Sequence, residues 1–448
     1  MIFSANFYLY ELFSQSTKLG DPLTQMSLDE MIVLLRLEAK ASLSSISEIV
    51  KLHNYSKSSV GLISERLKKF GGKLPSTLKL NKPREVFYLS DEIYASGKPI
   101  LVTIDPVSTA ILKIELGQNC TASTWKNHFQ DIEYNGFITK GLASDRGIGI
   151  VKGYEAMHSA EVWCSDHFHE FRGLTRLLKT METRAYQSIE NEEERLQVFN
   201  NARSESNMKN RLAQYESEKL ICEQRINEYQ HVQSVLNMLF PELYFFNIKT
   251  GSYHTSASVK EDILILMDLL DELKFDKLQD ETKSIRDHID DICVCYQQVD
   301  DICQTLSKTM TFEEIELIGI AWQHKHQSYQ RKGKLKKYHE NESDVWLEII
   351  SPLLGNDAEE LIAKAFDEFN SMVRTSSLIE MVNSQIRPFI NECKGQITQE
   401  HLNLIMFYHN HRLYKSGKRK GKAPIEILTK VKLQKNWLDL LSETIAQP

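Results

Sequence analysis

The hydrophobic pattern of residues 85–116 predicts three β-strands. The apolar runs are EVFYLSD (85–91), PILVTID (99–105) and STAILKIEL (108–116). Short breaks that contain Ser, Gly and Pro separate these runs, as is typical of an antiparallel meander. The next segments predict a helix at 121–134, a strand at 136–145, a helix punctuated by Gly and a strand at 160–166. The predicted order of elements is therefore βββαβαβ.

Apolar spacing in the first 80 residues predicts three helices. The first two each begin near a Ser that has a Glu three residues later, the pattern of a capping box: Ser27 with Glu30, and Ser45 with Glu48. A third helix follows the connection HNYS, with Ser56 as its expected N-cap. Its inward-facing residues are expected to be Val60, Ile63 and Leu67.

These three helices have the order and short connection of a helix-turn-helix. In that motif the start of the last helix enters the major groove of DNA, where Lys57, Ser58 and Ser59 would lie. A three-helix module used only for packing is the alternative. The short polar and basic side chains at these positions favour DNA binding.

Residues 174–240 contain neither Gly nor Pro and are rich in Glu, Arg, Gln, Leu and Lys. This composition predicts long helices with a break near NARSESN. The helices could form a domain inserted into the core or an arm for dimerisation, and the sequence does not separate these two uses.

Composition indicates a globular protein of several domains. The 448 residues are 42% hydrophobic and 26% charged, enough for a large core that divides into domains. No apolar stretch of about 18 residues without charge occurs, and the N-terminus lacks a basic leader, so we expect a cytoplasmic protein without a membrane partner. Seven cysteines without a CxxC pair exclude a typical disulfide framework or zinc ribbon.

The net charge of −7 conceals three basic runs that contain no acidic residue. They span 66–84, 323–339 and 411–422, and aromatic residues interrupt two of them. Such runs indicate contacts with the phosphates of nucleic acid. The residues expected to contact DNA from these runs are Arg66, Lys68, Lys69, Arg412, Lys418 and Arg419.

Trp322 precedes the second basic run and has two interpretations. Its aromatic ring could stack on an unpaired base near the site of cleavage. It also follows the apolar residues IELIGIA, so it could belong to a hydrophobic core. The sequence favours neither interpretation over the other.

Acidic residues end two of the predicted strands. Asp91 ends the first strand and Asp145 ends the fourth. A later helix, with Ser376 or Ser377 as its expected cap, carries Glu380, Asn383 and Arg387 on one face. Three converging carboxylates suit Mg²⁺ or Mn²⁺, and two such ions about 3.5–4 Å apart can promote phosphodiester cleavage.

The order of strands and the positions of these acids resemble the DDE-type transposases of bacterial insertion sequences, which have an RNase H-like fold. The resemblance rests on YLSDEIY before PILVTIDPVSTAIL, LASDRG, DHFH (166–169), SSLIEMVNSQIRPF, and FYHNHRLY followed by APIEIL. It implies that Asp91, Asp145 and Glu380 are catalytic and bind two Mg²⁺ or Mn²⁺ ions, with Asn383 in a supporting role. Arg387 would contact DNA.

The resemblance also implies a domain organisation. We expect an α/β RNase H-like core with a mixed five-stranded sheet and flanking helices, interrupted by a large helical insertion. The expected segments are 1–80 (helix-turn-helix), 81–170 (first part of the core), 171–370 (insertion), 371–425 (second part of the core) and 426–448 (C-terminal tail).

Two other acids compete for a place in the site. Glu92 neighbours Asp91 but should point to the opposite face of the strand, which makes it a poorer ligand. Asp166 also ends a strand and is followed by His167 and His169, which could bind metal or phosphate. We assign Asp166 and His169 a supporting role, with Asp166 as the alternative second ligand.

The expected activity is metal-dependent cleavage at transposon ends and transfer of the 3′-hydroxyl strand into target DNA. The implied partners are double-stranded DNA at the ends and the target, and a second copy of the chain, in a bacterial, nucleoid-associated protein. Two alternatives remain open: a DNA-binding regulator derived from a transposase, and an RNase H-like nuclease specific for DNA structure.

Overall fold

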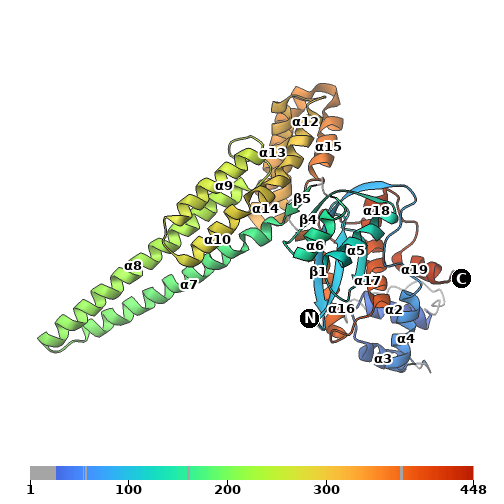
Figure 1. Ribbon diagram of the computed structural model, residues 1–448, viewed down its shortest axis with the longest axis horizontal. Coiled ribbons are helices and arrows are strands. Elements are labelled where there is room, and N and C mark those ends of the chain that lie inside the picture. The colour runs from blue at the N-terminus through green and yellow to red at the C-terminus, as the bar shows by residue number, and fades with distance from the viewer. Residues whose placement is uncertain (1–26, 54, 56–57, 159–161, 374–376, 447–448) are drawn as a thin grey trace. The chain divides into compact units, whose positions relative to one another are not determined.

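The computed structural model describes residues 27–53, 55, 58–158, 162–373 and 377–446. The chain divides into two compact units (Figure 1). The first unit comprises 1–161 and 376–448, so that two distant parts of the chain fold together. The second unit comprises 162–375.

A mixed sheet of five strands has the order β3-β2-β1-β4-β5. The strands are β1 (Arg84–Ala95), β2 (Lys98–Ile104), β3 (Ile111–Leu116), β4 (Phe137–Ser144) and β5 (Trp163–Ser165). β1 pairs with β2 and β2 with β3 in antiparallel orientation, whereas β1 and β4 are parallel. The predicted meander and the predicted order of elements are therefore confirmed.

The turn between β1 and β2 fixes the register of this hairpin. Ala95 pairs with Lys98, which leaves Ser96 and Gly97 as a two-residue loop. Both loop residues have positive φ, 48° and 79°, as tight hairpin turns of the primed types require. The six residues of β2 after Lys98 are all buried, so this strand lies in the core.

Helices of the first unit pack against the sheet (Figure 1). They are α5 (Ala122–Tyr134), α6 (Ile148–Glu155), α16 (Ser377–Glu392), α17 (Gln399–His411), α18 (Pro424–Thr429) and α19 (Trp437–Ala446). Phe129 of α5 stacks on Tyr88 of β1 with ring centroids 5.9 Å apart. On α17, the Asn410 side chain accepts from the backbone N of Ile111 and donates to its O, at 2.8 and 2.9 Å. Asn410 thus satisfies backbone groups of β3.

The first three described helices are α2 (Leu28–Leu37), α3 (Leu43–Leu52) and α4 (Val60–Gly71). The capping box of Ser27 is present as predicted. The cap of α3 is Ser42, three residues before the predicted Ser45, because its hydroxyl accepts from the Ser45 backbone N–H.

The N-cap of α4 is Ser59, and the predicted cap Ser56 lies outside the described residues. The helix therefore begins later than predicted. Ile63 and Leu67 are buried as expected, but Val60 is 43% exposed because it occupies the first turn.

α4 packs closely on α17. A Cβ added to Gly71 would lie 1.8 Å from the Glu400 backbone O, so only glycine permits this approach. Asn403 of α17 donates hydrogen bonds to the backbone O atoms of Gly71 and Leu74, at 3.0 and 2.8 Å. The three N-terminal helices thus belong to the same compact unit as the meander β1 to β3.

The second unit is helical apart from the short β5. Its two longest helices, α7 (His167–Asn200) and α8 (Glu205–Glu242), lie side by side (Figure 1). The break between them falls at residues 201–204, as predicted near NARSESN. The remaining α-helices are α9 (Ser256–Asp271), α10 (Asp276–Asp287), α11 (Ile289–Cys293), α12 (Gln297–Leu306), α13 (Phe312–Gln330), α14 (Gly333–Leu354) and α15 (Ala358–Phe369), with short 3₁₀ turns at Val294–Tyr296 and Gly355–Asp357.

None of the helices in the described ranges has the length and apolar character that crossing a membrane requires.

Candidate active site

Parallel pairing of β1 and β4 brings Asp91 and Asp145 to corresponding positions. Leu89 pairs with Ala143, and each acid lies two residues further along its strand direction. Asp91 is still within β1, and Asp145 directly follows the last residue of β4. Both side chains are half-buried. The two strands therefore direct both acids to the same end of the sheet.

Helix α16 brings polar side chains from the distant second part of the unit to Asp91. The Asn383 Nδ2 donates a hydrogen bond of 2.7 Å to Asp91 Oδ2, and the Asn383 side chain is fully buried. One turn earlier lies Glu380, which forms an ion pair of 3.4 Å with Arg387. The helix begins at Ser377, whereas the predicted cap Ser376 lies outside the described residues.

The electrostatic environment links the three predicted acids. Burial, followed by the charges of Asp145 and Glu380, raises the pKa of Asp91 to about 7. Since like charges disfavour ionisation, this shift means that the other two carboxylates face Asp91 across a short distance. The arrangement can bind a proton or a cation, and perturbed carboxylates of this kind are frequent at functional sites.

Glu92 also approaches Asp145, from the other face of β1. Burial and then the charge of Asp145 raise the pKa of Glu92 to about 7. A Cβ built on Gly147 would lie 3.0 Å from Asp145 Oδ1 and 3.7 Å from Glu92 Oε1, so both oxygens border the same small space. Glu92 does alternate with Asp91, as expected, but this alternation does not remove it from the site.

The donor atoms at this position suit a hard divalent cation, which prefers carboxylate and amide oxygens. Asp91, Asp145 and Glu380 would supply carboxylates, and Asn383 Oδ1 is a buried oxygen without a partner in the described part of the chain. Among the described residues, no three His, Cys, Asp or Glu side chains form a group that could hold a metal ion. Because carboxylates repel one another, such a group closes only around a neutralising charge.

Asp166 caps α7 in the second unit. Its Oδ1 accepts from the Phe168 backbone N at 3.0 Å, its Oδ2 pairs with His169 Nδ1 at 2.8 Å, and the side chain is fully buried. These contacts are those of a structural helix cap. A supporting role for Asp166 and His169 in the site stays a prediction.

The predicted DNA contacts around α4 differ in their exposure. Lys57 lies outside the described residues. Ser58 is half-buried, and the Ser59 hydroxyl accepts from the Leu62 backbone N at 3.3 Å as the helix cap. Arg66 pairs with Asp29 of α2. Lys68 and Lys69 are exposed, so they are the cations of this helix most accessible to a phosphate.

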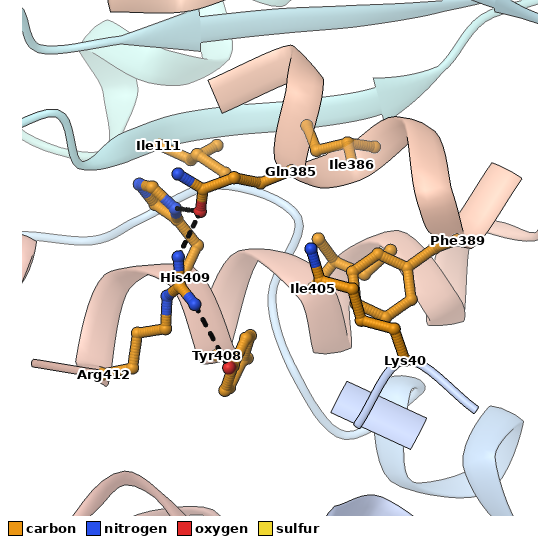
Figure 2. A pocket seen from close by; sticks show the side chains of 9 residues that line it. All are labelled: Lys40, Ile111, Gln385, Ile386, Phe389, Ile405, Tyr408, His409 and Arg412. Atoms are coloured by element: carbon orange, nitrogen blue, oxygen red, sulfur yellow. Dashed lines mark hydrogen bonds between the residues drawn. The ribbon is translucent and has the colours of Figure 1, made fainter. Parts of the chain in front are cut away.

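Arg412 has partners inside the first unit. Figure 2 shows it reaching from the end of α17 to Gln385 of α16, where Nη2 donates to Gln385 Oε1 at 2.5 Å. Its Nη1 donates to the Tyr408 hydroxyl at 3.2 Å, and His409 Nδ1 also lies 3.3 Å from Gln385 Oε1. Arg412 thus connects α17 to the helix that carries Glu380 and Asn383.

Arg419 and Lys418 occupy the basic segment after α17. The Arg419 guanidinium donates to the backbone O atoms of Pro106 and Val107 at 2.9–3.0 Å, and burial lowers its pKa. Lys418 is exposed. Arg412 and Arg419 therefore have structural partners in the loop and helix next to them, and their contact with DNA stays a prediction.

Trp322 is a core residue of the second unit. Its side chain is only 6% exposed and packs against Phe246 and Phe369, with ring centroids 6.1 and 5.8 Å away. Its Nε1 donates to Asn370 Oδ1 at 3.1 Å. The stacking interpretation is therefore corrected: the apolar residues before Trp322 place it on the buried side of α13.

A buried polar chain behind Glu92 was not predicted. The hydroxyls of Ser90 and Thr103 are 2.8 Å apart, and Thr103 Oγ1 lies 3.0 Å from His128 Nε2 of α5. Burial lowers the pKa of His128 to about 4, so this imidazole is neutral at physiological pH. The signal in the sequence was the presence of Ser90 and Thr103 at positions flanked by apolar residues.

No family model matches the chain, and no curated protein is significantly similar to it. Functional assignment therefore rests on the arrangement of the chain's own residues.

Proposed function

We propose that the first unit is the catalytic core of a DNA transposase of the DDE type, with an RNase H-like fold. The observation that carries the proposal is the position of Asp91, which faces Asp145 across neighbouring strands and Glu380 across α16. These residues come from three separate parts of the chain. A purely structural role would not require three acids to approach one another in a half-buried place.

In the proposed reaction, Asp91, Asp145 and Glu380 hold two Mg²⁺ or Mn²⁺ ions. Bound cations of this kind promote attack on a phosphodiester and stabilise the leaving oxygen. Asn383 keeps the Asp91 carboxylate oriented through its amide hydrogen bond. Arg387, which is exposed beside Glu380, offers a cation to the DNA backbone.

DNA would be bound through the exposed cations of α4 and of the segment after α17, which the lysines 68, 69 and 418 represent. This binding does not depend on the acidic cluster. The helical second unit would serve as the insertion domain, and α7 with α8 offers a long surface to a second copy of the chain. Cleavage and DNA binding are therefore separable by mutation.

The test uses the full chain and DNA that carries the terminal sequences flanking its gene. We expect strand cleavage and joining to a target with Mg²⁺ or Mn²⁺, and none with EDTA. Asp91→Asn, Asp145→Asn and Glu380→Gln should each abolish both reactions and leave DNA binding within about twofold of the unsubstituted chain. Glu85→Gln is the matched control, because Glu85 lies in the same strand about 20 Å from Asp91 and pairs with Lys140.

Three other outcomes assign the chain differently. Cleavage without joining would identify a nuclease, and DNA binding without cleavage would identify a regulator. Loss of activity in Asp166→Asn but not in Asp145→Asn would make Asp166 the second catalytic acid.

A further inference from the structure

We propose that Glu92 is a fourth carboxylate of this site and binds a divalent cation together with Asp145. The inference rests on the proposed metal-dependent function and extends it, because the three expected acids do not include Glu92.

The two faces of β1 carry different acids to the same end of the sheet. Tyr88 and Ser90, which share a face with Glu92, contact the side of the sheet covered by α5. Asp91 points to the opposite face, where Asn383 of α16 donates to it. Asp145, beyond the end of β4, acts electrostatically on both acids. The sheet end is therefore flanked by carboxylates on two sides.

Each side also has one buried oxygen without a hydrogen-bond partner among the described residues. On the α16 side this atom is Asn383 Oδ1, and on the other side it is Glu92 Oε2. Burying a polar oxygen without a partner costs about 1–3 kcal/mol, so such atoms usually point to a missing ligand. Two separate unpartnered oxygens beside the same group of acids are a second observation, independent of the acids themselves.

Gly147 leaves room for a ligand between Glu92 and Asp145. It is the N-cap of α6, and its backbone N donates to Asp145 Oδ1 at 3.0 Å. Because it has no side chain, the space bordered by Asp145 Oδ1 and Glu92 Oε1 stays open. A water molecule could satisfy the hydrogen bonds of these oxygens, but only a cation also neutralises the two facing carboxylates.

Binding of Mn²⁺ to the full chain, measured by calorimetric titration, tests this assignment without relying on activity. We expect Glu92→Gln to weaken binding of at least one Mn²⁺ by tenfold or more, as Asp145→Asn does. Glu85→Gln, which removes a carboxylate elsewhere on β1, should bind Mn²⁺ as the unsubstituted chain does. Glu92→Gln should fold normally, because it loses a repulsion with Asp145 and no hydrogen bond through Oε2.

A second variant distinguishes direct binding from an indirect electrostatic effect. Thiolate prefers softer ions than carboxylate does, so Glu92→Cys should bind Cd²⁺ more tightly relative to Mg²⁺. We expect this preference to rise at least tenfold over that of both Glu92→Gln and the unsubstituted chain, whose seven cysteines provide the background. Equal preferences in Glu92→Cys and Glu92→Gln would overturn the role of Glu92 as a ligand.

Failure of this inference differs from failure of the proposed function. If Asp91→Asn weakens Mn²⁺ binding but Glu92→Gln does not, Glu92 is not a ligand and the three-acid site stands. If the unsubstituted chain binds no Mn²⁺, both the fourth ligand and the metal-dependent function are overturned.

Discussion

Asn383 Nδ2 donates a hydrogen bond of 2.7 Å to Asp91 Oδ2 and thereby joins residues 292 positions apart. The donor is fully buried in α16, and the acceptor lies in the central strand β1. Because Asp91 also faces two other carboxylates, this amide is its printed side-chain donor in a place that disfavours negative charge. Asn383 therefore fixes the orientation of Asp91 and connects the two distant parts of the first unit.

Replacement of Asn383 by Leu removes this donor and keeps a side chain of similar size. We expect cleavage to fall about 10–100-fold, as is typical when the partner of a metal ligand is lost. DNA binding, measured by fluorescence anisotropy, should change little. Ser384→Ala on the exposed neighbouring position is the control. Cleavage at the unsubstituted rate in Asn383→Leu would show that Asp91 needs no such support.

The stability of the chain in EDTA should depend on the protonation of Asp91. Its pKa is about 7 in the folded chain, mainly through burial, against an ordinary value of 3.8. The folded chain therefore holds this proton more tightly, and the resulting stabilisation is complete below pH about 4 and lost as the pH rises through 7.

Urea unfolding of the unsubstituted chain and Asp91→Asn at pH 5.5 and 8 measures this effect. Asp91→Asn should gain free energy of unfolding relative to the unsubstituted chain as the pH rises. Glu85→Gln should show no such gain, because Lys140 lowers the pKa of Glu85. A constant difference between Asp91→Asn and the unsubstituted chain at both pH values would contradict the shift.

Gly71→Ala should separate α4 from α17. Its added Cβ would overlap the Glu400 backbone O at 1.8 Å, which requires a shift of one helix. Overpacking of this kind costs about 1–3 kcal/mol, measurable by urea unfolding. Gly61→Ala in the same helix has no heavy atom within 4 Å of the added Cβ, so it should be neutral or stabilising. Equal stability of both variants would refute close packing at Gly71.

Lys69→Ala should weaken DNA binding through the loss of a phosphate contact. Lys69 is exposed on α4, and each lost phosphate contact lowers the slope of log K against log salt by about one. Arg66→Ala provides a comparison, because Arg66 already pairs with Asp29. An unchanged slope in Lys69→Ala would exclude this lysine from the interface.

Trp322→Ala should destabilise the second unit by about 3–5 kcal/mol, the usual cost of removing a large buried aromatic side chain. The lost contacts are those with Phe246 and Phe369. Thermal unfolding should show a lower melting temperature for Trp322→Ala than for Tyr329→Ala, because Tyr329 is 48% exposed on the same helix. If Trp322→Ala melts with the unsubstituted chain, the residue is not part of the core.

The positions of Asp91 and Asp145 could be predicted because strand ends are local features. Apolar runs and turn residues located β1 and β4, and each acid follows from its own run. The helix of Glu380 was found through its periodicity, including the spacing that joins Glu380 to Arg387. By contrast, the starts of α3 and α4 were shifted by three residues, since several serines compete to cap each helix and the backbone selects one.

The sequence by itself determined the order of strands and helices, the break between α7 and α8, and which acids end strands, because these depend on patterns within a few residues. Only the tertiary structure decided that Glu92 approaches Asp145, that Arg412 joins α17 to α16, and that Trp322 is buried. Each of these relationships depends on the packing of elements far apart in the chain. Alternation along β1 correctly assigned Glu92 to the other face, but only the position of Asp145 beyond β4 brings both faces of the strand to one site.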